Sequence, residues 1–173
     1  MDAPQNPAGA YVSEESYGPQ RRDELIATIE IAPRVLREAV VGLSEDQCAT
    51  LYRNWTIRQI VHHLADSHVN SYVRFKWALT EELPTIKAYD EGRWAALDDS
   101  RTGDVRAPLA LLESLHARWT QLLRSMTEEQ FGRSFLHPET GQTVVLGAAL
   151  SYYAWHGRHH TAQINWLREQ RGW

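Results

Sequence analysis

Apolar side chains recur at three- and four-residue intervals over four long segments of this sequence, and that spacing places them on one face of an α-helix. The four segments are residues 21–41, 57–83, 109–123 and 147–171. A chain of 173 residues fits one domain. Because apolar helix faces must be buried against each other, we predict an all-α four-helix bundle over residues 21–173. Residues 1–20 are rich in Pro, Gly and Ser without a period, so we expect an N-terminal arm that is either mobile or laid over the bundle.

The second helix has the clearest start signal. Thr56 can cap the free N–H groups of its first turn, and Gln59 stands where it completes a capping box. The same pattern recurs at Ser44 after the first helix and at Thr127 after the third. If this recurring capping pattern reflects a true internal repeat rather than chance, the second and fourth helices occupy equivalent places in the bundle. Pro33 within the first segment predicts a kink or a late helix start.

Residues 83–107 form a connection of about 25 residues, whereas helix–helix connections are commonly about 2–8 residues long. The connection is therefore either a crossover strapped along the bundle or a lid near a functional site. Tyr89 and Trp94 are its aromatic side chains, and each suits both interpretations. Before the last helix, the runs SFLH and TVVL flank a turn at residues 138–141, which predicts a small β-hairpin.

The composition limits the classes of function. Asp and Glu number 22 against 18 Lys and Arg, a formal net charge of −4, which lacks the basic character of a nucleic-acid-binding protein. No apolar stretch reaches the roughly 18 residues of a membrane span. The single cysteine, Cys48, excludes an internal disulfide and favours a reducing compartment. We expect a cytoplasmic protein that acts on a small molecule and binds neither nucleic acid nor membrane.

The last helix carries a histidine pair. His156 and His160 are four residues apart, so both lie on one face, among small, aromatic and apolar residues. Such a pair is a ready two-point chelate for a divalent metal, although two hydrogen-bonded core histidines would share the pattern. Gly157 stands where a zinc protease of the H-E-x-x-H type has its glutamate, which disfavours that class.

A third ligand must come from another element, and several histidines are candidates. The candidates are His62, His63, His68, His116 and His137. His68 shares the apolar face of its helix and suits a packed core position. His63 lies on a polar stripe with Gln59, Asn70 and Arg74 that carries only one charge. An uncharged polar stripe fits a pocket wall better than a solvated face, so these three neighbours are candidate substrate-binding residues.

Four strings of this sequence closely resemble the YfiT branch of the DinB superfamily. They are WTIRQIVHHLADSHVNSYVRFK at 55–76, PTIKAYDE at 84–91, LLESLHARW at 111–119 and YAWHGRHH at 153–160. The resemblance implies an up-down-down-up bundle with a long crossover and three metal ligands, His63, His156 and His160. It also implies a cytoplasmic homodimer that binds one zinc or nickel ion per chain.

The resemblance leaves three functions open. Members of this branch are named as metal-dependent hydrolases, in which the ion activates water. Related branches are considered thiol S-transferases that use a low-molecular-weight thiol such as bacillithiol, and Arg74 would then hold a carboxylate of that thiol. A non-catalytic metal-binding module would instead need a closed site with four ligands. No catalytic residue is assigned, although Asp66 or Glu113 would suit a proton acceptor.

Overall fold

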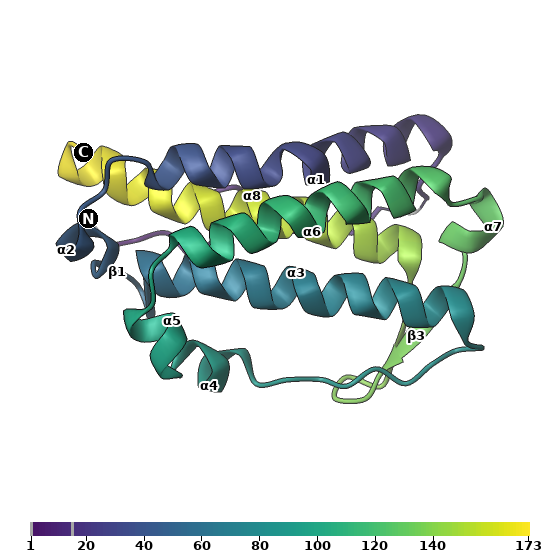
Figure 1. Cartoon of the computed structure of the whole chain (residues 1–173). Helices are drawn as coiled ribbons and strands as arrows, with labels where there is room; N and C mark the ends of the chain where they lie inside the picture. The colour runs from purple at the N-terminus through teal and green to yellow at the C-terminus, as the bar shows by residue number, and fades with distance from the viewer. Residues whose placement is uncertain (1, 15) are drawn as a thin grey trace.

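The structure is a computed structural model that describes residues 2–14 and 16–173. Its body is a four-helix bundle, which confirms the predicted fold class (Figure 1). The four long helices are α1 (Pro19–Val40), α3 (Ile57–Thr80), α6 (Arg106–Ser125) and α8 (Leu146–Arg171). Helices α3 and α6 run in the same direction, and α1 and α8 run in the opposite one, so the order is up-down-down-up. Helix α1 starts two residues earlier than predicted and continues through Pro33.

Short elements occupy the connections. They are α2 (Glu45–Cys48), β1 (Leu51–Tyr52), β2 (Trp55–Thr56), α4 (Glu91–Ala95), α5 (Asp98–Thr102), α7 (Glu128–Phe131), β3 (Ser134–His137) and β4 (Gln142–Val145). The hairpin is as predicted, except that β4 begins and ends one residue earlier. The β1–β2 pair and the two short helices of the crossover were not predicted, because none of them is long enough to show a period.

All three capping boxes are formed. In each of them the hydroxyl of Ser44, Thr56 or Thr127 accepts a hydrogen bond from the backbone N–H three residues on. The side chain of the glutamine at that later position accepts one from the capping residue's own N–H in return. The cap at Thr56 sets the start of α3.

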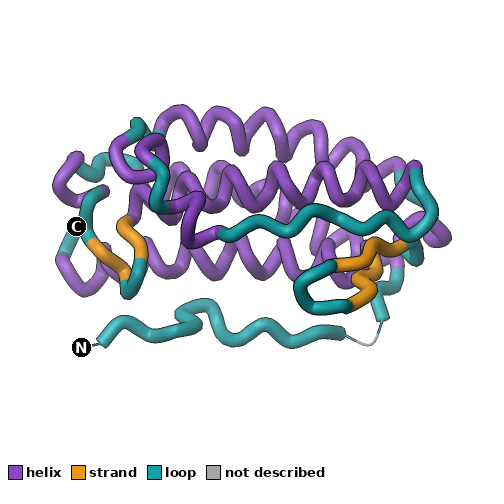
Figure 2. The backbone as a smooth tube through the Cα atoms, turned by 90° about the horizontal axis from the view of Figure 1, so that it is seen from below, coloured by secondary structure: helices purple, strands orange, loops and turns teal. Residues whose placement is uncertain are grey.

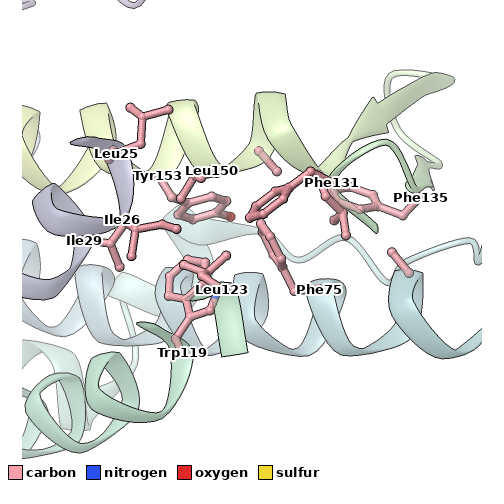
Figure 3. Close-up of a cluster of buried hydrophobic side chains, with 14 of the residues drawn as sticks. Leu25, Ile26, Ile29, Phe75, Trp119, Leu123, Phe131, Phe135, Leu150 and Tyr153 are labelled. Atoms are coloured by element: carbon pink, nitrogen blue, oxygen red, sulfur yellow. The ribbon is translucent and has the colours of Figure 1, made fainter. Parts of the chain in front are cut away.

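The apolar core is divided in two. One cluster gathers around Phe75 and Trp119 (Figure 3), and the other around Ile60 and Leu112. Polar residues of α3, α6 and α8 are also buried in the bundle, and six of them are histidines. The six are His63, His68, His116, His156, His159 and His160. A layer of imidazoles therefore crosses the middle of the bundle.

The crossover lies along the bundle and is attached at both ends (Figure 2). Near α3 it bonds to the hairpin, since Ile86 N–H donates to the Leu136 carbonyl at 3.1 Å and Leu136 N–H donates to the Pro84 carbonyl at 2.9 Å. At its far end, the Gln59 amide donates to the Ala95 carbonyl at 2.8 Å. These attachments hold the segment between them over the face formed by α3 and α8.

The N-terminal arm also runs along the bundle (Figure 2). Trp155 on α8 donates its indole N–H to the Gly9 carbonyl at 2.9 Å, and Tyr11 packs edge-on against Tyr152 with ring centroids 5.3 Å apart. The arm is thus laid over the body in the residues that the structure describes. Within those residues, no helix combines the length and the apolar character needed to cross a membrane.

We expect Thr56→Ala to lower the free energy of unfolding by about 1 kcal/mol, because the first turn of α3 loses its side-chain cap. Thr28→Ala is the matched control, since Thr28 lies inside α1 and its hydroxyl donates to the Glu24 carbonyl of its own helix. Urea unfolding followed by circular dichroism measures both variants. Equal stability of the two would show that the cap contributes nothing.

Candidate metal centre

Three histidines from two helices meet in the imidazole layer. His63 of α3 and His156 and His160 of α8 place one ring nitrogen each within 4.8 Å of the others, and all three side chains are buried. The Nε2 atoms of His63 and His156 are 3.3 Å apart. Two imidazole nitrogens that share one zinc ion at about 2.05 Å and a tetrahedral angle lie roughly 3.3 Å apart. The spacing therefore fits a divalent ion.

Local structure brings these rings together. His156 and His160 project from successive turns of α8, with ring centroids 4.6 Å apart. Trp55, immediately before the cap of α3, lies against His63 at 4.5 Å and stacks on His160 at 6.1 Å. The indole therefore covers one side of the cluster and keeps both rings in place.

A chain of hydrogen bonds leads away from His156. His156 Nδ1 lies 3.3 Å from His68 Nε2, and His68 Nδ1 lies 2.8 Å from His116 Nε2. His116 Nδ1 ends the chain at the Ile29 carbonyl oxygen, 2.6 Å away. A carbonyl only accepts, so His116 must carry its proton on Nδ1. A neutral ring carries one proton, so His116 Nε2 accepts from His68 Nδ1, and His68 Nε2 accepts from His156 Nδ1. His156 therefore presents an unprotonated Nε2 to the cluster.

Pro33 explains why the Ile29 carbonyl is available. In a regular helix this oxygen would accept the N–H of the residue four positions on, and that residue is proline, which has none. The oxygen is therefore left without its helical partner and accepts His116 instead. A residue that would ordinarily weaken α1 supplies the acceptor at which the imidazole chain ends.

His160 is oriented from its own helix. Its Nδ1 lies 2.8 Å from Gln163 Oε1, and Gln163 Nε2 lies 3.0 Å from His159 Nε2. The amide oxygen accepts, so His160 carries its proton on Nδ1 and leaves Nε2 free, as His156 does. Partners of this kind fix the tautomer and ring orientation of histidines that bind metals.

The buried rings are neutral at pH 7. Removal from water disfavours the imidazolium form, which lowers the pKa of His63 to about 4 and that of His160 to about 3. Burial lowers the pKa of His156 well below its ordinary value, and the neighbouring histidines add to the effect. Neutral imidazole is the form that binds a metal ion, so the cluster needs little proton release to bind one.

The cluster opens into a pocket of about 910 Å³. His63, Ser67 and Arg74 of α3 form one wall, and residues of α8, the hairpin, the crossover and the arm form the others. A second pocket of about 900 Å³ adjoins it and shares Trp55 and His160 among its lining residues. Each volume suits one small molecule.

Comparison with known proteins agrees with this architecture. A family model for the DinB superfamily matches residues 28–164. This chain belongs to the DinB superfamily. A relative from Bacillus subtilis, named "Putative metal-dependent hydrolase YfiT", is 48% identical over 169 residues, which cover 96% of this chain and 95% of that protein. A relative from Bacillus licheniformis, with the same descriptive name, is 43% identical over 175 residues, which cover 100% of this chain and 99% of that protein.

The solved structure of Bacillus subtilis YfiT superposes on this DinB protein with a TM-score of 0.95. The two chains are 48% identical, and the match covers 97% of each. YfiT is described as having an unusual four-helix bundle topology, and the parallel pair α3 and α6 shows how that order arises here. The family, the fold and the relation to proteins named as metal-dependent hydrolases are thus established for this DinB protein.

The remaining predicted site residues are divided between the pocket and other places. Arg74 lines the larger pocket with His63. Gln59 lies outside both pockets, because its amide completes the α3 cap and holds the crossover. Asn70 is also outside and donates to the Asp66 carbonyl in its own helix. The three side chains that share a stripe with His63 therefore have different roles.

Neither proposed proton acceptor reaches the cluster. Glu113 pairs with Arg37 on the surface at 2.8 Å. Asp66 is absent from the lining of both pockets, and burial, with the nearby Asp99, raises its pKa to about 6. Of the histidines left open by the sequence, His68 and His116 belong to the hydrogen-bond chain, whereas His137 lines the pocket from the hairpin.

Sequence reasoning missed Tyr152 and Tyr153 as pocket residues. Tyr89 belongs to the connection whose placement the sequence left open. The structure puts Tyr89 in the pocket lining, and Trp94, which lines neither pocket, packs against it at 4.5 Å. The link between Pro33 and the histidines was also missed, although a proline inside a helix always frees the carbonyl four residues before it.

We expect His116→Phe to change the tautomer of His68 in metal-free protein. The phenyl ring keeps the stacking on His68, but His68 Nδ1 loses its acceptor, so the proton moves in part to Nε2. Long-range ¹H–¹⁵N correlation spectra of the imidazoles report this directly. His137→Phe is the control, since His137 lies outside the chain. A wild-type His68 that already carries its proton on Nε2 would contradict the assignment.

We expect metal-free protein to lose stability as the pH falls from 6.5 to 5. The folded pKa values of His63, His116 and His160 lie near 4 or below, so only the unfolded chain takes up their protons in this interval. Each such histidine lowers the free energy of unfolding by at most about 1.4 kcal/mol per pH unit. Asp66 acts in the opposite direction, because its raised pKa lets the folded protein take up one proton in this interval. Urea unfolding at several pH values measures the slope, and constant stability over the interval would contradict it.

Proposed function

We propose that this protein holds one divalent ion through His63, His156 and His160 and hydrolyses a small-molecule substrate beside it. Zinc is our first choice of ion and nickel the alternative, since both suit three imidazoles. The observation that carries the proposal is the junction of these three buried rings at the floor of an open pocket. The names of the relatives support the same class of reaction.

The protein contributes orientation and charge state. The chain from Ile29 and the amide of Gln163 turn the Nε2 lone pairs of His156 and His160 towards the cluster. Because all three rings are neutral, they leave the charge of an ion uncompensated. When bound, the ion supplies a Lewis acid that polarises a carbonyl or lowers the pKa of water to about 7.

The surroundings of the cluster favour a reactive site over a closed one. A structural site would need a fourth strong ligand, and within residues 2–14 and 16–173 no further histidine, cysteine or carboxylate joins the three. The carboxylates among the pocket's lining residues are those of Glu91 on the crossover and Glu139 on the hairpin. Of the described side chains, these two are our candidates for accepting a proton from an attacking water.

A thiol S-transferase is the second candidate, and the two adjoining pockets favour it. A transferase must hold a thiol and an electrophile together, and two spaces of about 900 Å³ that share His160 provide room for both. In that reaction the thiol replaces water as the nucleophile, and the protein again orients the reactants. The homodimer and the cytoplasmic location that the family resemblance implies stay predictions.

The test compares reaction classes with metal-loaded protein. We expect hydrolysis of a panel of activated esters and amides without added thiol, and we expect His160→Ala to lose at least about tenfold in metal affinity and the turnover with it. Elemental analysis measures the bound ion, and release of the chromogenic leaving group measures the rate. His137→Ala is the matched control, because it removes a pocket histidine outside the cluster.

Two results would decide against the proposal. Full metal content in His160→Ala would remove the assigned ligand set. Turnover of an electrophile only when bacillithiol or another low-molecular-weight thiol is added would replace hydrolysis with the transferase.

A further inference from the structure

One buried cation in the pocket has no counter-charge in the part of the chain that the structure describes. Arg74 is only 8% exposed, yet within residues 2–14 and 16–173 it forms no salt bridge. Its one hydrogen bond is a long one, from Nη1 to the Tyr153 hydroxyl at 3.4 Å, and its buried Nε has no partner. An arginine carries five donors and stays charged, so burial without an acceptor is costly.

The other buried arginine of this protein shows the contrast. Arg58 is equally buried at 8% and its Nε also has no partner, but its guanidinium pairs with the Glu45 carboxylate and donates to the Arg101 carbonyl at 3.3 Å. Arg58 lines neither of the large pockets, whereas Arg74 lines the one that contains the histidine cluster. Among the residues that the structure describes, the buried cation without a counter-charge is therefore the one that a ligand can reach.

Neutral donors surround the guanidinium. The Tyr153 hydroxyl touches it, and Tyr89 and Tyr152 line the same pocket. Burial raises the pKa of Tyr152 to about 12 and raises that of Tyr89 as well, so both phenols keep their protons and can donate. The pocket's carboxylates, Glu91 and Glu139, belong to residues that are exposed to solvent. The buried part of the pocket therefore favours a negatively charged ligand group.

The distance from the histidines defines the shape of the ligand. Arg74 follows His63 by eleven residues on α3, a rise of roughly 16 Å, and helical side chains lean back towards the N-terminus. Allowing for that lean, the guanidinium and the cluster are separated by a distance on the order of 10 Å. Phe135, Val144 and Ala149 line the space as apolar side chains.

We propose that Arg74 binds the anionic end of the substrate, a carboxylate or a phosphate, while the reacting bond lies at the histidine cluster. The substrate class is then an elongated small molecule with an apolar middle and one negative terminus. This inference rests on the proposed function for the reaction, but the anion site itself needs no metal.

The experiment uses metal-free protein, so that a carboxylate has no ion to bind. The probe is 4-phenylbutyrate, and its neutral counterpart is 4-phenylbutanamide, with saturation-transfer NMR titration as the measurement. We expect the amide to bind at least about tenfold more weakly than the acid, because charge-assisted hydrogen bonds to arginine are lost. A third titration with 3-phenylpropylphosphonate distinguishes a carboxylate site from a phosphate site. The ligand that binds more tightly identifies the anionic group that the site prefers.

Variants assign the effect to one residue. Arg74→Gln is expected to lose at least about tenfold in affinity for the acid and to bind the amide unchanged. Arg93→Gln is the matched control, because it removes the same charge from an exposed residue that lines neither pocket. Should Arg74→Gln fail to fold, as judged by circular dichroism, the acid–amide comparison on wild-type protein still tests whether the pocket prefers an anion.

Equal affinity of acid and amide, equal affinity of folded Arg74→Gln and wild type, or no binding of either anion would overturn the inference. Failure of the proposed function is seen separately, as full metal content in His160→Ala or as turnover that requires a thiol. Neither result depends on the anion titration of metal-free protein.

Discussion

The burial of six imidazoles in a helical bundle is the constraint on which this structure depends. Buried rings must be neutral and hydrogen-bonded, because charge and unpaired polar atoms are expensive away from water. The chain from His156 through His68 and His116 meets that requirement by ending at the Ile29 carbonyl. Pro33 frees that carbonyl, so a defect in one helix sets the protonation pattern of a ring on another.

The topology turns this polar layer into a pocket. Because α3 and α6 run in the same direction, the chain between them must return along the whole bundle, and it is pinned there by the hairpin and by Gln59. The crossover therefore brings Tyr89 over the face where α3 and α8 present their histidines. The N-terminal arm adds Tyr11 from the other side. Both segments of irregular structure thus belong to the site.

Local signals account for the parts of the structure that the sequence predicted. The four apolar stripes, the capping pattern at Thr56 and the paired runs of the hairpin each involve neighbours within about four residues or one turn, so they are visible without a fold. The pairing of His156 with His160 is of the same kind. Gln59 and Asn70 show the limit of this reasoning, since sharing a stripe with His63 did not bring them into the pocket.

The sequence by itself determined a helical bundle, the bounds of its long helices to within a few residues, and a histidine pair on one buried face. It also carried the strings that mark the DinB superfamily, and through them the triad of His63, His156 and His160. Only the tertiary structure decided that Arg74 is buried with no carboxylate partner among the described residues, that Tyr89 reaches the pocket, and that Ile29 orients His156 through two other rings. The physical reason is the distance along the chain between the interacting residues. Periodicity and capping depend on residues one turn apart, whereas the hydrogen bonds of the imidazole chain and of Arg74 join residues 48 to 88 positions apart along the chain, which only packing brings together.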